Sequence, residues 1–238
     1  EGITLDPKDL AAGRYGTHEM VQIWGQEKTF DYSLRVQGEA ASTLSRLHPD
    51  IIAAEQAAEI KQKANIQHVA PDRIRELEKK GKHDIIALNT ALEEVLNEYA
   101  RPHVNKFKTS ADTTEPARAI QIKAALEVII GSVENLRDIV LEKSVEWKNI
   151  SHIDCTHGYD AMPTVAGRPF AHYAEMLQSD LRMLAHVYNH AIMGKWSDAT
   201  GNHHTAKSAG VDGIVLEGEY CNHLGIKHMI ASAQLPGL

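Results

Sequence analysis

The 238-residue sequence is poor in several features that would place it in a particular class of protein. It has only two cysteines, Cys155 and Cys221, and their spacing fits neither a metal site nor a redox motif, which favours a reducing compartment. Its longest apolar run, around residues 124–133, includes Glu127 and is too short to cross a bilayer. No signal-peptide pattern opens the chain. These absences predict a cytoplasmic protein with no membrane partner.

Positive charge is also scarce, since 25 Lys and Arg residues stand against 32 Asp and Glu, for a formal net charge of -7. A nucleic-acid-binding protein usually carries a basic excess, so we expect no nucleic-acid partner. An anionic substrate would need local cationic residues that work against this weak global field. The sequence also has no Gly-rich phosphate loop and no Gly-x-Ser-x-Gly nucleophile motif.

Aromatic residues make up only 5% of the chain, whereas residues that favour helices are frequent. This composition predicts an all-α fold. The fourteen histidines stand out, because histidine titrates near neutral pH and serves acid–base or metal chemistry. Alternatively, most of them are surface or capping residues. His186 and His190 share a helical face but lack the glutamate of a zincin motif, so no metal site is predicted.

Apolar periodicity predicts a small helical domain over residues 1–107 and the first part of a long-helix bundle domain over 108–238. In the first domain we expect an irregular arm over 1–16 and helices over 17–47, 51–65, 71–81 and 84–99. In the second we expect rods over 115–146 and 170–193, loop-like segments over 151–163 and 194–218, and a short helix over 219–224. A rod of about thirty residues spans about 45 Å, which is typical of a bundle. Two rods leave apolar stripes uncovered, so other chains or a further part of the protein must complete the core.

Polar clusters interrupt the helical pattern at two places in the predicted first domain. Arg14 and Tyr15 lie between glycines, where the guanidinium fork suits a phosphate or carboxylate. The alternative is a turn with a surface arginine. Lys82, His83 and Asp84 open a helix whose free N–H groups favour an anion. The alternative here is that Asp84 merely caps the helix and His83 is exposed.

Two further clusters precede the expected rods. Residues 108–114 are rich in hydroxyl groups, among them Thr109 and Ser110, ahead of a helix whose dipole favours negative charge. Ordinary capping explains one of these residues but not so dense a cluster. His157 lies between a hydroxyl residue and a glycine, where its ring would exchange protons near pH 7 if it faces a cavity. The alternative is a solvated loop histidine.

Taken in this order, the clusters resemble the fumarase/aspartase superfamily and, within it, the adenylosuccinate lyases. The motifs that carry the resemblance are Arg14-Tyr15, His83-Asp84, Thr109-Ser110-x-Asp112, Thr156-His157-Gly158 with Ala161-x-Pro163-Thr164, Gly201-Asn202 and Gln234. The Arg-Tyr and His-Asp pairs are unusual for fumarases or argininosuccinate lyases. The chain departs from the family pattern at Lys108, Cys155 and Tyr159.

The resemblance implies a fumarase/aspartase-like fold and a homotetramer with shared active sites. It implies β-elimination of fumarate from adenylosuccinate, which gives AMP, and from SAICAR, which gives AICAR, in purine biosynthesis. No metal or organic cofactor is implied. A mobile loop with the catalytic base serine, and a small C-terminal domain, would lie beyond Leu238.

The resemblance also implies roles for individual residues. His157 would be the general acid that protonates the departing nitrogen. The implied substrate-binding residues are Arg14 and Tyr15 at the phosphate, Lys82, His83 and Asp84 in the same pocket, Thr109 and Ser110 at a succinyl carboxylate, and Gln234. Two other readings stay open. The first is another fumarate-releasing lyase that acts on a different amine, and the second is a catalytically incomplete helical assembly module.

Overall fold

The computed structural model describes residues 16–235, which are mainly helical, as the composition predicts. The chain divides into two compact units. Unit 1 contains the described residues up to Ala124 and those from His190 onward, and unit 2 is Ala125–Asn189. The predicted domain boundary between residues 107 and 108 stays a prediction. Within the described residues, no helix is both long and apolar enough to span a membrane.

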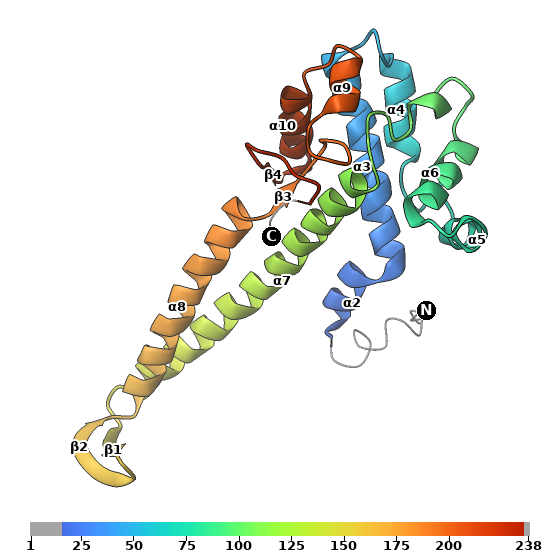
Figure 1. Ribbon diagram of the computed structural model, residues 1–238. Helices are drawn as coiled ribbons and strands as arrows, with labels where there is room; N and C mark the ends of the chain where they lie inside the picture. The colour runs from blue at the N-terminus through green and yellow to red at the C-terminus, as the bar shows by residue number, and fades with distance from the viewer. Residues whose placement is uncertain (1–15, 236–238) are drawn as a thin grey trace. The chain divides into compact units, whose positions relative to one another are not determined.

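Unit 1 is organised around α3, whose Leu34, Val36 and Leu44 side chains are buried in the core. This helix packs against α4 and α10 (Figure 1). The elements of this unit are α2 (His18–Trp24), α3 (Gln26–Leu47), α4 (Ala54–Lys63), α5 (Pro71–Gly81), α6 (Asp84–Val95), the 3-10 helix η2 (Arg101–His103), the first part of α7 (Ala111–Glu146), β3 (Met193–Gly194), α9 (His204–Ser208), α10 (Gly213–Leu224) and β4 (Lys227–His228).

The single helix expected over residues 17–47 is in fact two helices. Thr17 caps α2, as its hydroxyl accepts a hydrogen bond from the Met20 N–H. The chain then becomes extended at Gly25, which ends α2 and precedes α3. A glycine makes the helical conformation less favourable in free energy. Here the glycine stands where one helix ends and the next begins. The apolar spacing continues across the break, which is why periodicity alone does not reveal it.

The segment over residues 194–218, expected to be irregular, holds α9 and the first half of α10. Asp212 caps α10 by accepting hydrogen bonds from the N–H groups of Ile214 and Val215. Gly213 follows directly and packs against His203, so that a Cβ atom at Gly213 would lie 2.3 Å from the His203 Cβ. Gly213, which discourages a helix in the sequence, is therefore required here by close packing.

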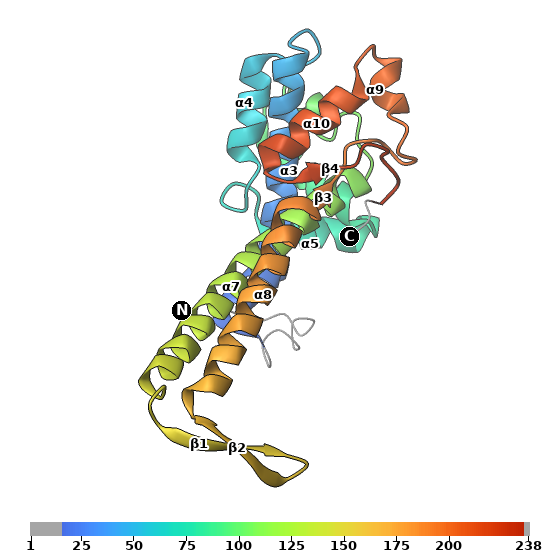
Figure 2. The ribbon, with the colours of Figure 1, turned by 90° about the vertical axis from the view of Figure 1, so that its left-hand side faces the viewer.

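Unit 2 is a helical hairpin whose two arms are joined by a β-ribbon. The second part of α7 runs beside α8 (Gly167–His190), and β1 (Ser151–Thr156) pairs antiparallel with β2 (Tyr159–Val165) at one end (Figures 1 and 2). The Arg137 guanidinium donates a 2.8 Å hydrogen bond to the Gln178 side chain across the two helices. The predicted rods are thus confirmed as long helices.

The prediction of a loop over residues 151–163 is wrong, because this segment forms the β-ribbon. Its turn consists of His157 and Gly158, with φ angles of 54° and 82°, as a two-residue hairpin turn requires. Both strands are exposed on nearly every residue, and a bulge between Asp154 and Cys155 interrupts the register. A ribbon without a buried face has no apolar alternation for a sequence pattern to reveal.

Large apolar side chains remain exposed along both helices of unit 2. They are Ile129, Leu136, Ile139, Leu141 and Val145 on α7, and Tyr173, Met176, Met183 and Val187 on α8. Large exposed apolar areas usually mark a region that another chain or segment covers. Within unit 2 itself, these side chains stay exposed.

Candidate active site

The loop that carries Thr109 and Ser110 is held in place by its neighbours in unit 1. The backbone carbonyl of Phe107 accepts a 3.1 Å hydrogen bond from the Trp196 indole. The backbone N–H of Thr109 donates a 2.9 Å hydrogen bond to the carboxylate of Asp112, one turn further along the chain. Both contacts fix the main chain of the loop beside Thr109 and Ser110.

Ser110 meets His83, although the two residues are 27 positions apart in the sequence. The Ser110 Oγ lies 3.4 Å from His83 Nε2. His83 also caps α6, since its Nδ1 accepts from the Ile86 N–H, and in the tautomer that makes this cap Nε2 carries the hydrogen and donates to Ser110. The Asp84 carboxylate lies 3.2 Å from the same Nδ1 and accepts from it when Nδ1 carries a hydrogen.

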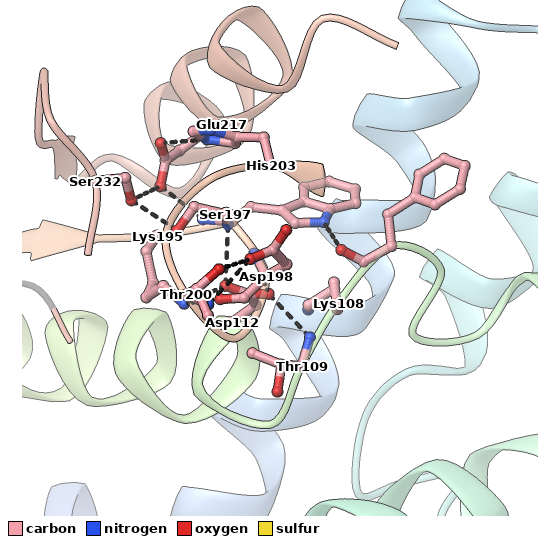
Figure 3. A network of polar contacts seen from close by, with 12 residues as sticks. Lys108, Thr109, Asp112, Lys195, Ser197, Asp198, Thr200, His203, Glu217 and Ser232 are labelled. Carbon is pink, nitrogen blue, oxygen red and sulfur yellow. Dashed lines mark hydrogen bonds and ion pairs between the residues drawn. The ribbon is translucent and has the colours of Figure 1, made fainter. Parts of the chain in front are cut away.

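Asp112 is the centre of a buried polar network (Figure 3). Its carboxylate forms a 2.7 Å ion pair with Lys195, and the two side chains are 0% and 1% exposed. It also accepts backbone hydrogen bonds from Ser197 at 3.0 Å and Asp198 at 3.1 Å. A buried carboxylate is tolerated only where it is paired and fully hydrogen-bonded, and Asp112 meets both conditions. The network fastens the start of α7 to the segment that follows β3.

Glu217 is a second buried carboxylate in the same network. It accepts hydrogen bonds from the Trp196 backbone N–H at 2.9 Å and from the Ser232 hydroxyl at 2.8 Å. Its other oxygen lies 3.0 Å from His203 Nε2. These contacts connect α10 to the chain near Ser232, two residues before Gln234.

Lys108 is half-buried and points its ammonium group into unit 1. Its Nζ donates a 3.2 Å hydrogen bond to Gln37 Oε1 and lies 5.9 Å and 5.5 Å from the ring centroids of Trp196 and Tyr220. Burial lowers the pKa of Lys108 to about 7, although the negative charge of Asp112 opposes this effect. Lys108 therefore changes its charge close to neutral pH.

The partner of Lys108, Gln37, is itself buried among polar side chains. Its Nε2 lies 2.7 Å from Asn89 Oδ1, 3.1 Å from Asn105 Oδ1 and 3.1 Å from Thr113 Oγ1. The single Gln37 amide therefore connects α3, α6, the 104–110 loop and α7. Such a network is specific because each buried polar group depends on the others for a partner.

The structure brings only some of the predicted site residues together. His83 contacts Ser110, and Thr109 precedes Ser110 in the same loop. Lys82 ends α5 in a left-handed conformation with a φ of 54°, and it is exposed like Asp84. Gln234 is exposed near the end of the described chain.

Of the remaining predicted residues, one belongs to unit 2 and two lie outside the described residues. His157 belongs to unit 2, where it occupies the exposed turn of the β-ribbon. Arg14 and Tyr15 lie outside the described residues. Sequence reasoning missed the roles of Lys195, His203 and Glu217, because their partners are distant in sequence and no local motif contains them.

Known proteins share both the sequence pattern and the fold. A family model described as "Lyase" matches residues 13–216. The chain is 32% identical to the adenylosuccinate lyase of Methanocaldococcus jannaschii over 99% of this chain and 49% of that protein. It is 30% identical to the Bacillus subtilis enzyme of the same name over 93% of this chain and 48% of that protein. The predicted resemblance is thus confirmed, and the chain spans about half the length of the curated relatives it matches.

Solved structures confirm the predicted fumarase/aspartase-like fold. A fumarate lyase from a Mesorhizobium species superposes with a TM-score of 0.79 at 20% identity, over 90% of this chain and 49% of that one. A β-carboxy-cis,cis-muconate cycloisomerase from Acinetobacter calcoaceticus superposes with a TM-score of 0.80 at 16% identity, over 91% and 50%. At such low identity the likeness concerns the fold alone.

Proposed function

This chain belongs to the lyase family, and on that basis we propose that it forms part of an adenylosuccinate lyase. The complete protein would release fumarate from adenylosuccinate to give AMP, and from SAICAR to give AICAR. The observation that carries this proposal is the pairing of Ser110 with His83 beside Thr109, over the buried network of Asp112. Such a pair of fixed hydroxyl groups suits a carboxylate of the succinyl group.

The chemistry of the elimination explains why fixed donors are needed. A base removes the proton from the carbon beside a carboxylate, and negative charge builds up on that carboxylate. The C–N bond then breaks, a C=C bond forms, and the nitrogen takes up a proton. Donors that are already oriented where charge develops stabilise such a transition state, and we assign this role to Thr109 and Ser110. The reaction balances without an oxidant, a metal or an organic cofactor.

We assign the remaining predicted residues to the same substrate. Arg14 and Tyr15 bind the phosphate region, with Lys82, His83 and Asp84 in the same pocket, and Gln234 contacts the substrate. His157 protonates the leaving nitrogen, for which a group that titrates near neutral pH is suited. The relatives named adenylosuccinate lyase support these assignments at the level of the family.

We further propose a cytoplasmic homotetramer in which subunits share active sites. The exposed apolar side chains of α7 and α8 support an assembly, because they present a surface that association would bury. The acidic balance of the chain supports the absence of a nucleic-acid partner.

A second candidate is a fumarate-releasing lyase with a different amine substrate. Lys108, Cys155 and Tyr159 favour it, since each departs from the pattern of the family. Turnover by the complete gene product, with adenylosuccinate and argininosuccinate compared, separates the two. We expect cleavage of adenylosuccinate. Cleavage of argininosuccinate alone would establish the second candidate, and cleavage of neither would favour a helical assembly module.

A further inference from the structure

Lys108 has no role in the proposed chemistry, yet it is the residue whose setting is most unusual. It immediately precedes the two proposed carboxylate donors, Thr109 and Ser110. Its long side chain does not extend into solvent but reaches Gln37 and an edge-to-face pair of rings, Trp196 and Tyr220, whose centroids lie 5.0 Å apart. An ammonium group in this setting has exchanged most of its hydration for one amide oxygen and two ring faces.

We propose that Lys108 is a positioning residue that links proton uptake to the binding of a dicarboxylate at Thr109 and Ser110. Its ammonium group holds the loop in its binding conformation, and the negative charge of the bound carboxylate favours the protonated form in turn. This inference rests on the proposed function in one respect, namely that Thr109 and Ser110 receive a carboxylate.

Lys108 anchors the loop that carries the two proposed donors. Three consecutive residues of the loop are anchored separately: Phe107 by the Trp196 indole, Lys108 by Gln37, and Thr109 by Asp112. Figure 3 shows Lys108 and Thr109 next to Asp112 in this loop. Of the three anchors, only that of Lys108 uses a side chain of the loop, so it alone can be removed by substitution within the loop.

The Lys108 hydrogen bond also orients the Gln37 amide. Because the ammonium group donates to Oε1, the Nε2 side faces Asn89, Asn105 and Thr113, which all offer oxygen atoms. Thr113 lies in the first turn of α7, directly after the donors. Loss of the ammonium proton weakens this contact and with it the connection between the loop and α3.

The charge of Lys108 also interacts with a bound anion. Burial brings the pKa of Lys108 to about 7, so at neutral pH a large fraction of the molecules carry a neutral amine. An anion on the adjacent residues favours the charged form and raises that pKa. Linkage is reciprocal, so if the anion favours the proton, the proton strengthens anion binding by the same factor. Dicarboxylate binding near pH 7 should therefore take up a proton.

Other charged or titratable groups near Lys108 and the Tyr220 ring that it contacts come from several elements. Asp112 of α7 is paired with Lys195, and Glu39 of α3 is paired with Arg46 and Lys61. On α10, burial raises the pKa of the Tyr220 hydroxyl and of the Cys221 thiol above their usual values, so both keep their protons at neutral pH.

Two histidines complete this set. His103 has a pKa below its usual value because of burial and the nearby Lys106 charge, and His83 contacts Ser110. Since both are unchanged in Lys108 variants, a comparison of those variants with the wild type isolates the contribution of Lys108.

The test measures fumarate binding to the complete gene product by titration calorimetry between pH 6 and 8.5, in two buffers of different ionisation enthalpy. In the wild type we expect the affinity to fall about fivefold or more across this range, which is the lower end of typical coupling between sites, with proton uptake near pH 7. Lys108→Arg, which stays charged, should bind tightly with little pH dependence. Lys108→Met should bind weakly at every pH. Lys207→Met, at an exposed lysine of α9, is the matched control and should behave like the wild type.

The outcomes separate this inference from the proposed function. Equal pH dependence in the wild type and Lys108→Met would overturn the role of Lys108, whether or not adenylosuccinate is cleaved. Proton-linked fumarate binding without cleavage of adenylosuccinate would support Lys108 and contradict the proposed substrate. Absence of fumarate binding in the wild type would overturn both the carboxylate site and the role of Lys108. If Lys108→Met does not fold, as judged by circular dichroism, Lys108→Arg decides, since a pH dependence equal to that of the wild type would contradict the inference.

Discussion

The carboxylate of Asp112 and the ammonium group of Lys195 form an ion pair from which solvent is almost completely excluded. Lys195 also donates a 2.7 Å hydrogen bond to the backbone carbonyl of Asp198, whose own N–H donates to Asp112. The pair therefore closes a ring of contacts between the first turn of α7 and the segment after β3. The loop with Thr109 and Ser110 depends on this ring, because Asp112 also holds the Thr109 N–H.

Breaking this pair should destabilise the protein strongly. In Asp112→Asn the shape of the side chain is kept, but Lys195 is left as a buried charge without its counter-charge, which typically costs about 3–5 kcal/mol. Chemical denaturation of the wild type and the variant measures this cost. The matched control is Glu94→Gln, which breaks an exposed pair with Arg73 and should cost less than about 1 kcal/mol. Equal effects of the two substitutions would contradict the assigned role of Asp112.

Gly213→Ala should destabilise unit 1 because there is no room for the added methyl group. Its Cβ would lie 2.3 Å from His203 Cβ, so α10 or the His203 backbone has to move, at a cost of about 1–3 kcal/mol. Gly131→Ala is the control, because Gly131 lies within α7 with no other atom within 4 Å of the added group. There we expect a gain of about 0.5–1 kcal/mol from the helix propensity of alanine. A stabilised Gly213→Ala variant would show that the close contact with His203 is absent.

The pKa of Lys108 predicts that stability rises with pH from about pH 7. The folded protein loses the Lys108 proton near pH 7, whereas the unfolded chain keeps it up to its usual pKa of 10.5, so the unfolded state binds more protons in between. The burial penalty is therefore fully present below pH 7 and is relieved above it. The melting temperature between pH 6.5 and 8.0 measures the effect, because in this range the Cys221 thiol, whose usual pKa is 9.0, stays mostly protonated in the folded and in the unfolded chain. In Lys108→Met, the rise of the melting temperature with pH that is due to Lys108 should vanish. An unchanged rise would show that Lys108 does not cause it.

His157→Ala in the complete protein should reduce turnover of adenylosuccinate by about 10²–10⁴-fold, the usual contribution of a positioned general acid. Because His157 is exposed at a turn of unit 2, the substitution should leave the melting temperature of the protein unchanged. His223→Ala, at a partly exposed histidine of α10, is the control and should retain full turnover. Full turnover in His157→Ala would remove His157 from the mechanism.

The predictions from the sequence succeeded where structure depends on local spacing. The helices over 71–81 and over most of 111–146 follow from apolar residues three and four apart, from Pro71 at a helix start and from Gly81 at its end. The break at Gly25 was missed because the apolar spacing in the sequence continues across it. The ribbon was missed because neither of its faces is buried.

For the candidate site, the sequence does not reveal contacts between residues that lie far apart along the chain. Ser110 and His83 each stand in a recognisable motif, so their proximity could be expected once the family was suspected. The contacts of Asp112 with Lys195 and of Glu217 with His203 join segments whose meeting depends on the packing of whole helices. The inward direction of the Lys108 side chain has the same origin, because the aromatic rings that it meets come from residues 196 and 220.

The exposed ribbon of unit 2 has a consequence for how activity would depend on dilution. His157 sits at the tip of two strands that have no buried face, so no packing within unit 2 fixes its position. In the proposed tetramer, a neighbouring subunit would have to hold this proposed proton donor in place. Specific activity should therefore decline at protein concentrations where the assembly dissociates, and return on reconcentration.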